Sequence, residues 1–299
     1  MSPPPAESMA LPLASRAVRR RGTSRGRAAT NVVMTAVCGG AVLLAVVPLC
    51  SVLWLVISRG GRALSLSFFT RLPVPVGELG GGIGNAIVGT IYLVGLACLI
   101  GLPLGIGAGV YLAEHGERPL ARATRFVAEV LAGVPSIVIG VVAYGLIVLP
   151  MKRFSAIAGA LALAIIMLPQ LARTTEEMVR LVPQSLREAS LALGVPAWRT
   201  SLSVVLRTAL GGVCAAALLA IARAAGETAP LLFTALNNQY WGVRPDEPMA
   251  SLTVQIFNYA ISPYEDWHDK AWGAALCLLV LIGGLSLLAR LTQRRRAAA

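Results

Sequence analysis

Long apolar runs separated by polar or basic segments dominate this sequence of 299 residues. A run of 18 or more apolar residues is long enough to cross a hydrocarbon core of about 30 Å as an α-helix. Backbone amides in lipid must find their partners within the segment, so such runs predict helices. The pattern predicts six spans, at residues 31–57, 85–112, 126–149, 155–172, 208–235 and 271–291. We therefore expect an all-α polytopic membrane protein.

Composition supports this prediction, with 56% hydrophobic residues, 13% charged residues and a mean hydropathy of +0.73. The net charge of +12 would also suit a nucleic-acid-binding protein, but the distribution of the charge argues against that class. With the N-terminus inside, eighteen of the 26 basic residues fall in cytoplasmic segments or, for Arg290, at the cytoplasmic end of the last span, seven fall in outer segments, and Arg223 alone falls within a span. Because basic residues stay on the cytoplasmic side, both termini are predicted to be cytoplasmic.

The chain divides by composition into three regions. Residues 1–30 are rich in Pro, Ser, Ala and Arg without an apolar period, which predicts a disordered basic cytoplasmic tail. Residues 31–291 form the six-helix transmembrane domain, and residues 292–299 form a cytoplasmic C-terminal tail. A basic start followed by an apolar run is also typical of a signal peptide. The run after Thr30 is about twice the length of a signal core, which favours an uncleaved first span.

Two spans carry residues that affect helix packing. Gly101, Gly105 and Gly109 are four residues apart and therefore share one face, which permits a close helix–helix approach. This face predicts either a tight interface in a translocation core or ordinary packing. The third span contains Pro135, which frees a backbone carbonyl. We expect either a bent helix that lines a pathway or a structural kink.

The sequence lacks the usual elements of catalysis. A phosphate-binding loop needs GxxxxGK[ST], and the only lysines, Lys152 and Lys270, are in no such context, so the chain should not hydrolyse ATP. The two histidines, His115 and His268, fall in predicted loops. No metal or cofactor site is expected. Five cysteines without CxxC spacing, predicted to be packing residues within spans, are Cys38, Cys50, Cys98, Cys214 and Cys277.

The loop at residues 173–207 is predicted to extend the fourth helix, stop at Pro183 and form a short new helix. Ser185 followed by Glu188 is a capping-box pattern, and Gly194 allows the chain to turn. One side of this helix is charged, through Arg187 and Glu188. The other side is apolar, through Leu186, Ala189, Leu191 and Leu193. Such a helix docks into another protein or lies on the membrane surface.

This loop resembles the signature loop of ABC importer permeases, with the spacing Glu-Ala-Ala-x3-Gly-x9-Ile-x-Leu-Pro (the EAA motif). The matching positions are Glu188, Ala189, Ser190, Gly194, Val204 and Leu206. Ser190 replaces the second Ala, Val204 replaces Ile, and Arg207 replaces the Pro that would start the fifth span. The resemblance implies a coupling helix, from Glu188 to Gly194, that sits in a groove of a separate ATPase subunit.

Four further segments, at residues 85–90, 131–138, 173–177 and 222–232, resemble phosphate-importer permeases of the PstA type. The resemblance begins near residue 80 and continues to the C-terminus. It implies the MetI-like fold of type I importers and a non-catalytic permease subunit of the bacterial inner membrane, for ATP-driven phosphate transport. Its implied partners are a second, PstC-like permease, a PstB-like ATPase dimer and an extracytoplasmic PstS-like phosphate-binding protein.

Arg223 is the main candidate for contact with the substrate. A charge in the centre of a span costs about 2.5–3.5 kcal/mol on insertion scales, so a function is expected. Glu227 lies four residues on, but Arg before Glu is the less favourable order for a helical pair. A guanidinium suits a tetrahedral oxyanion, and Thr228 could add a hydroxyl. The alternative is an interhelical salt bridge that only stabilises the bundle. Arg173 is a weaker candidate for an anion exit or gate, or it extends to the membrane surface.

Other functions stay open at this point. The chain could be an ABC permease for another oxyanion such as sulfate or molybdate. An ion-driven secondary transporter would need no ATPase. A membrane-bound enzyme is disfavoured, because no paired carboxylates or cluster of metal ligands is evident.

Overall fold

The computed structural model describes residues 25–75, 77–78 and 80–297, so the expected tail over residues 1–24 lies outside the described residues. Within the described part every regular element is helical. In chain order the helices are α1 (Arg25–Ala63), α2 (Leu66–Thr70), α3 (Gly84–Glu114), α4 (Pro119–Gly133), α5 (Ser136–Ala143), the π-helical turn η1 (Tyr144–Val148), α6 (Leu149–Met151), α7 (Ala156–Arg180), α8 (Gln184–Ala192), α9 (Ala197–Thr200), the π-helical turn η2 (Ser201–Val205), α10 (Leu206–Ala225), α11 (Ala229–Thr234), α12 (Leu252–Ala260) and α13 (Glu265–Ala297).

The chain divides into two compact parts, Met1–Leu53 and Trp54–Ala299, and the packing described below lies within the second. Helix α1 begins before the expected residue 31 and continues past residue 57 to Ala63. Its most apolar window has a mean hydropathy of 2.6. A helix that is apolar on all sides suits a lipid environment.

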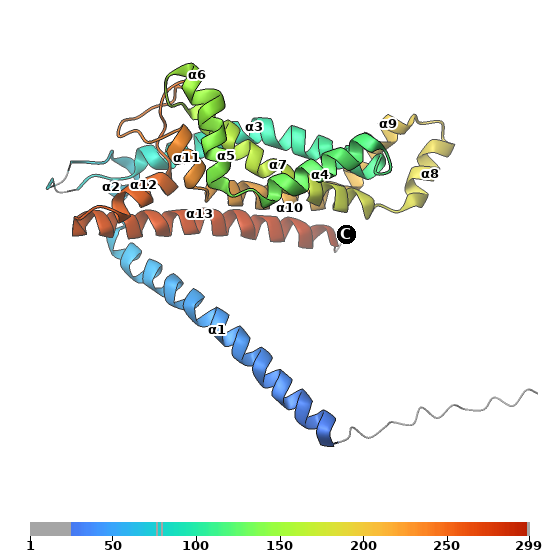
Figure 1. Ribbon diagram of the computed structural model, residues 1–299, viewed down its shortest axis with the longest axis horizontal. Coiled ribbons are helices and arrows are strands. Elements are labelled where there is room, and N and C mark those ends of the chain that lie inside the picture. The colour runs from blue at the N-terminus through green and yellow to red at the C-terminus, as the bar shows by residue number, and fades with distance from the viewer. Residues whose placement is uncertain (1–24, 76, 79, 298–299) are drawn as a thin grey trace, which may run out of the picture. The chain divides into compact units, whose positions relative to one another are not determined.

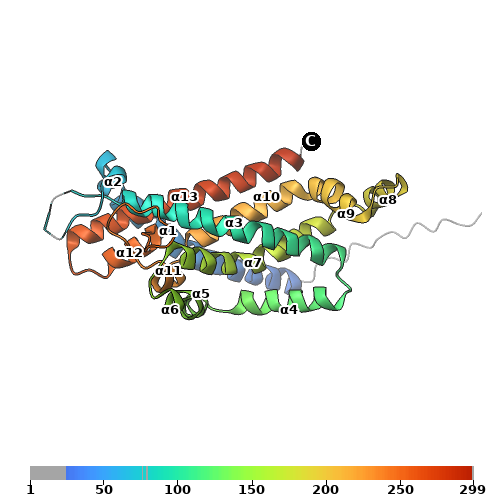
Figure 2. The same ribbon diagram turned by 90° about the horizontal axis from the view of Figure 1, so that it is seen from above.

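The second part is a helical bundle built around α7 (Figures 1 and 2). Helix α3 packs along α7, and α10 contacts both α7 and α13. The largest buried apolar cluster joins α3, α7 and α10, with Leu93, Leu163 and Leu171 among its fully buried members. Helices α8 and α9 lie at one end of this bundle, and α2 and α12 lie at the other in both views.

The glycine face of α3 is confirmed as a site of close approach to α7. A Cβ atom added to Gly105 would lie 2.6 Å from the Cβ of Leu171, and one added to Gly109 would lie 2.5 Å from the Cβ of Thr175. Both distances are too short for real atoms, so only glycine allows the two backbones to pack at this spacing. Gly101 is looser, because its added Cβ would meet Ala164 at an ordinary 3.6 Å.

The third predicted span is broken rather than merely kinked. Its first half, α4, begins at Pro119, earlier than the expected residue 126, because proline is well tolerated in the first helical turn. The second half, Ser136–Met151, is turned by 104° relative to α4. Val134 takes the extended backbone that a following proline favours, so Pro135 explains the break. Among the described residues, five helices are long and apolar enough to cross a membrane, or six if this bent pair counts as one span.

The predicted fifth span, residues 208–235, is wrong at both ends. The continuous helix begins after Pro196 at Ala197, passes through η2, and ends at Ala225. A new short helix, α11, follows at Ala229, with Pro230 in its first turn. Pro196 stands directly before this continuous helix. Arg207 is an exposed residue inside the helix, so the missing motif proline does not disturb the start of the span.

Two connections contain helices that were expected to be loops. The connection before α3 holds α2, and the connection before the last span holds α12. Helix α13 begins at Glu265, earlier than the predicted residue 271, so His268 is helical rather than in a loop. The loop before α12 is held to the bundle by Asn85, whose Nδ2 donates to the carbonyl of Asn238 at 2.6 Å.

Candidate functional site

The break between α4 and α5 forms one wall of a cavity of about 250 Å³, which we call the Pro135 cavity. It is enclosed by the α4–α5 break, by the middle of α7 and by the end of α10. Its lining consists of Leu131, Ala132, Val134, Pro135, Ser136, Ile139, Ile166, Pro169, Gln170, Arg173, Arg223 and Glu227. Arg173, Arg223 and Glu227, three of the residues singled out from the sequence, thus come together here.

Arg223 and Glu227 face this cavity from a second helix break. Helix α10 ends at Ala225, so the two residues do not share one continuous helical face as predicted. Nε of Arg223 lies 3.9 Å from Oε1 of Glu227, which is a loose ion pair. The Arg223 side chain is 61% exposed and that of Glu227 is 17% exposed. A cation in the last turn of a helix is also favoured by the helix dipole.

The remaining predicted contact, Thr228, does not line the cavity. It is the N-terminal cap of α11, where its carbonyl accepts hydrogen bonds from the N–H groups of Leu231 and Leu232. The backbone at this break is fixed further by Thr253, whose hydroxyl donates to the carbonyl of Glu227 at 2.9 Å. In this structure Thr228 therefore shapes the break that places Glu227.

Gln170 belongs to the site without having been predicted from the sequence. This residue lines the Pro135 cavity, and its Oε1 is buried without a hydrogen-bond partner among the described residues. The available signal was its position three residues before Arg173 on the same helix, which places the two on neighbouring points of one face.

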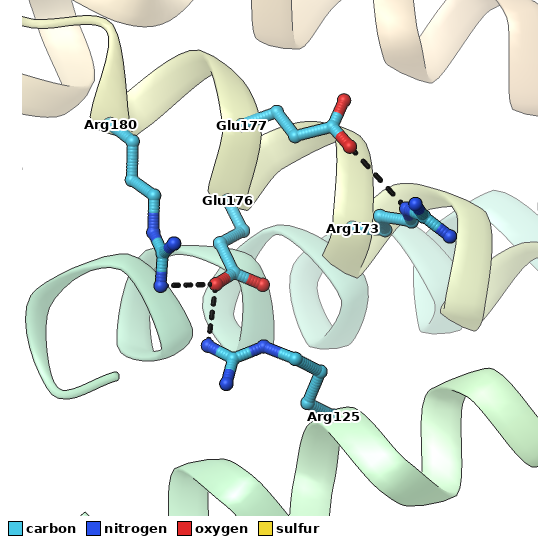
Figure 3. Close-up of polar contacts among 5 residues, drawn as sticks. All are labelled: Arg125, Arg173, Glu176, Glu177 and Arg180. Carbon is cyan, nitrogen blue, oxygen red and sulfur yellow. Dashed lines mark hydrogen bonds and ion pairs between the residues drawn. The ribbon is translucent and has the colours of Figure 1, made fainter. Parts of the chain in front are cut away.

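A second cavity, of about 210 Å³, lies between α4 and α7, and we call it the Glu176 cavity. The Glu176 side chain is only 8% exposed. Its Oε1 is 2.6 Å from Nη2 of Arg125 on α4 and 2.7 Å from Nη2 of Arg180 on α7 (Figure 3). A buried carboxylate needs such partners, because an unpaired charge is costly to bury. The ion cluster therefore joins α4 to α7.

Arg173 points away from this cluster on α7 and pairs with Glu177 at 3.3 Å (Figure 3). Both side chains are mostly exposed, so the pair is weak and the guanidinium is available to other partners. Arg173 lines the Glu176 cavity as well as the Pro135 cavity. It therefore stands in the wall that the two cavities share.

The predicted coupling segment forms a separate helical arm. Helix α7 continues to Arg180 as expected, and α8 begins after Pro183. The expected serine cap is wrong, because Pro183 occupies the cap position, no side chain caps α8, and Ser185 lies inside the helix. The turn at Gly194 is confirmed, with φ of +78°, a left-handed conformation that favours glycine.

The arm exposes most of its apolar side. Leu186, Leu191 and Leu193 are all exposed, as are Glu188 and Ala189. This leaves an apolar surface at the end of the bundle, of the kind that another protein or a membrane surface would cover.

The arm is fixed to the bundle by polar contacts. Arg187 forms an ion pair with Glu114 at the end of α3, and its Nη2 donates to the carbonyl of Val179 at 3.0 Å. Ser190 is buried and its hydroxyl is 2.9 Å from that of Thr200 on α9. The serine that replaces the second alanine of the motif thus binds α8 to α9.

Other candidate chemistry is structural. The five cysteines are free and lie in helices as predicted; Cys98 and Cys277 are partly buried and the other three are exposed. Within the described residues, no group of three His, Cys, Asp or Glu side chains could hold a metal ion. The ring of His115 stacks on Tyr111 at 4.9 Å between centroids, and Nε2 of His268 lies 2.6 Å from the carbonyl of Ser262.

The long apolar helices of the described residues define a polytopic membrane protein. The chain belongs to the family of binding-protein-dependent transport system inner membrane components, whose model matches residues 101–297. It is therefore a multi-pass inner-membrane permease subunit and not a catalytic chain, as the missing phosphate-binding loop predicted. This membership favours the ABC permease hypothesis over an ion-driven secondary transporter.

Relatives cover most of the chain. The phosphate transport system permease protein PstA of Yersinia pestis is 45% identical over 240 residues, covering 80% of this chain and 81% of the relative. The protein of the same name from Haemophilus influenzae is 43% identical, covering 81% and 86%. PstA 1 of Mycobacterium tuberculosis is 39% identical, covering 85% and 86%.

A solved structure confirms the expected MetI-like fold. A chain of the MetNI methionine ABC transporter in an inward-facing conformation matches with a TM-score of 0.56 and 19% identity, over 72% of this chain and 94% of that chain. A second crystal form of that transporter gives 0.53 and 21%.

Proposed function

We propose that the chain is the permease subunit of an ATP-driven importer of inorganic phosphate, and that the Pro135 cavity belongs to the route of the anion. The observation that carries this proposal is the convergence of Arg173, Arg223 and Glu227 on one cavity between two helix breaks. Backbone breaks at membrane depth are tolerated where they line a cavity, and intramembrane charges usually serve a pathway.

The chemistry of the cavity suits a tetrahedral oxyanion. The guanidinium of Arg223 offers five N–H donors in a planar fork, and its ion pair with Glu227 is loose enough to leave them available. The N-terminal end of α5 adds its partial positive charge, because Ser136 lines the same cavity. Glu227 weakens the field of Arg223, so that a bound anion can also leave.

The relatives support phosphate as the anion. Those described above are named as permease proteins of phosphate transport systems, at 39–45% identity over at least 80% of this chain. We extend that substrate to this chain because the charged residues of the cavity lie within the aligned family region.

The exposed arm supports an ATPase partner. We assign the α8 end of the bundle and both termini to the cytoplasm, where the apolar side of α8 would dock into a PstB-like ATPase dimer. Glu188 and Ala189 are exposed for that contact, whereas Ser190 and Gly194 shape the arm. A PstC-like second permease and an extracytoplasmic PstS-like phosphate-binding protein at the opposite end complete the complex.

The test is reconstitution of the complete complex in vesicles, with labelled phosphate accumulation measured with and without ATP. Arg223→Gln should abolish uptake while the complex still assembles. Arg207→Gln is the matched control, because Arg207 is an exposed arginine of the same helix outside the cavity, and it should transport normally. Normal uptake by Arg223→Gln would remove the cavity from the mechanism. The permease alone should accumulate nothing, since the energy comes from ATP on another chain.

Competition identifies the anion. Excess unlabelled phosphate should suppress uptake, whereas excess sulfate or molybdate should not. Suppression by sulfate or molybdate instead would assign the chain to another oxyanion, and ATP-independent accumulation would assign it to a different transport class.

A further inference from the structure

The Glu176 cavity adjoins the Pro135 cavity. Ala132, Pro169 and Arg173 belong to the linings of both, so the two cavities share a wall. The Glu176 cavity then extends along α7 to Arg180, close to the start of α8. It therefore lies between the Pro135 cavity and the helical arm.

The two cavities overlap along a single helix, because α7 lines the Pro135 cavity from Ile166 to Arg173 and the Glu176 cavity from Pro169 to Arg180. The Pro135 cavity begins at Ile166 on α7, and the Glu176 cavity ends at Arg180. At 1.5 Å per residue, these two positions are separated by about 21 Å along the helix axis. This length accommodates two successive anion positions, with Arg173 between them.

Each of the four arginines along this line has a carboxylate partner. Arg223 lies 3.9 Å from Glu227, and Arg173 lies 3.3 Å from Glu177. At the far end two arginines share one carboxylate. Their contacts with Glu176 are the shorter ones of this series, at 2.6 Å for Arg125 and 2.7 Å for Arg180.

We propose that the Glu176 cavity is a second anion-binding site, through which a tetrahedral oxyanion passes after the Pro135 cavity. This inference rests on the proposed phosphate function. Arg125 and Arg180 bind the anion, and Glu176 competes with it for the same guanidinium groups. Glu176 therefore occupies the guanidinium groups when the site is empty and promotes release when it is full.

The geometry of the cluster allows this exchange. Each guanidinium contacts Glu176 through its Nη2 atom, and both contact the same oxygen, Oε1. A guanidinium carries five N–H donors, so donors remain for an anion before the carboxylate has to move. The Arg125 and Arg180 side chains are 32% and 53% exposed, which makes them accessible from the cavity.

The equal numbers of positive and negative side chains in the lining favour release of the anion over tight binding. The lining contains three arginines and three glutamates, which are Arg125, Arg173, Arg180, Glu129, Glu176 and Glu177. A partly buried arginine pair without a carboxylate would hold a phosphate group strongly, because charge-assisted bonds in a low-dielectric site are strong. With the carboxylates present, the lining is neutral overall, and the site binds the anion only in passing.

The experiment measures two quantities on the assembled transporter: equilibrium binding of labelled phosphate by the solubilised complex without the binding protein, and the maximal uptake rate after reconstitution. Arg125→Gln and Arg180→Gln should each lower both quantities, by on the order of tenfold for one lost charge-assisted bond. Glu176→Gln should raise binding by a similar factor and lower the uptake rate, because the anion is retained.

The opposite signs of the binding changes distinguish this proposal from a structural tie between α4 and α7. A purely structural ion pair is lost when either partner is replaced. Arg125→Gln and Glu176→Gln would then change phosphate binding in the same direction, or not at all. Either result overturns the second site. Should Glu176→Gln fail to assemble, Glu176→Asp keeps the charge but shortens its reach, and should also raise binding.

Two controls separate the outcomes. Arg122→Gln removes an exposed arginine of α4 outside the cavity and should behave like the unmodified complex. If the unmodified complex transports no phosphate, the proposed function fails. If it transports phosphate, Arg223→Gln is inactive, and Arg125→Gln and Arg180→Gln behave normally, only the second site is disproved.

Discussion

At the residue scale, Ser190 shows how one departure from the family motif is used. The motif has alanine at this position, which would leave the hydroxyl of Thr200 buried without its partner. Here the two hydroxyls lie 2.9 Å apart, and both residues are buried. An unsatisfied buried hydroxyl costs about 1–3 kcal/mol, whereas replacing both partners costs much less. Each hydroxyl therefore supplies the hydrogen-bond partner that the other needs, and the pair fixes α8 against α9.

A double-mutant cycle tests this dependence. Ser190→Ala and Thr200→Val should each lower the stability of the solubilised protein by about 1 kcal/mol, and the double variant should lose less than their sum, with a coupling of at least about 0.5 kcal/mol. Thermal unfolding measures all three. Ser203→Ala is the control, since Ser203 is exposed in η2, just after α9, and it should be nearly neutral. Strict additivity would show that the two hydroxyls do not interact.

At the element scale, the helix breaks explain which parts of the structure the sequence predicts. Apolar runs locate the spanning helices, but the run across residues 208–235 hides a break. Gly226 and Pro230 both favour a helix end, whereas the apolar run across them predicts a continuous span. The contact between Arg125 and Glu176 had no such signal. These residues are 51 apart, and only the packing of α4 on α7 brings them together.

The close packing of α3 on α7 gives a second prediction. Gly105→Ala and Gly109→Ala should each destabilise the protein by about 1–3 kcal/mol, because the added methyl group overlaps Leu171 or Thr175. Gly107→Ala is the control on the same helix, where nothing lies within 4 Å of an added Cβ, and it should be neutral or slightly stabilising. Thermal inactivation in detergent measures all three, and equal stability among them would contradict the packing.

The turn after α8 gives a third prediction. Gly194 has φ of +78° and open space around it, so only backbone strain opposes a side chain there. Gly194→Asn should be tolerated, because asparagine accepts this conformation, whereas Gly194→Val should distort the arm. We expect Gly194→Val to lose phosphate uptake while keeping ATP hydrolysis, in a reconstituted complex. Equal uptake by the two variants would show that the turn does not position the arm.

At the scale of the whole molecule, the two ends of the bundle differ in what they expose. One end carries the α8–α9 arm, and the other carries α2, α12 and the loop between α11 and α12. The distribution of basic residues predicts that the arm is cytoplasmic. Sequence reasoning can assign the sides from charge, because insertion depends on local charge and not on how the helices pack.

Cysteine labelling tests this orientation. Leu193 on the arm is 84% exposed and Tyr240 in the opposite loop is 73% exposed. A membrane-impermeant maleimide should label Tyr240→Cys in spheroplasts, and Leu193→Cys only after permeabilisation. The unmodified protein is the control, because its five cysteines lie in spanning helices. Labelling in the reverse pattern would invert the assigned topology.

Arg173 belongs to the linings of two adjoining cavities, and this has a consequence for genetics. A substitution at Arg173 alters both cavities at once. Its effect on transport should therefore mask the effect of a substitution confined to one cavity. Substitutions at Arg173 and Arg223, or at Arg173 and Arg125, should therefore combine non-additively in their effect on phosphate uptake.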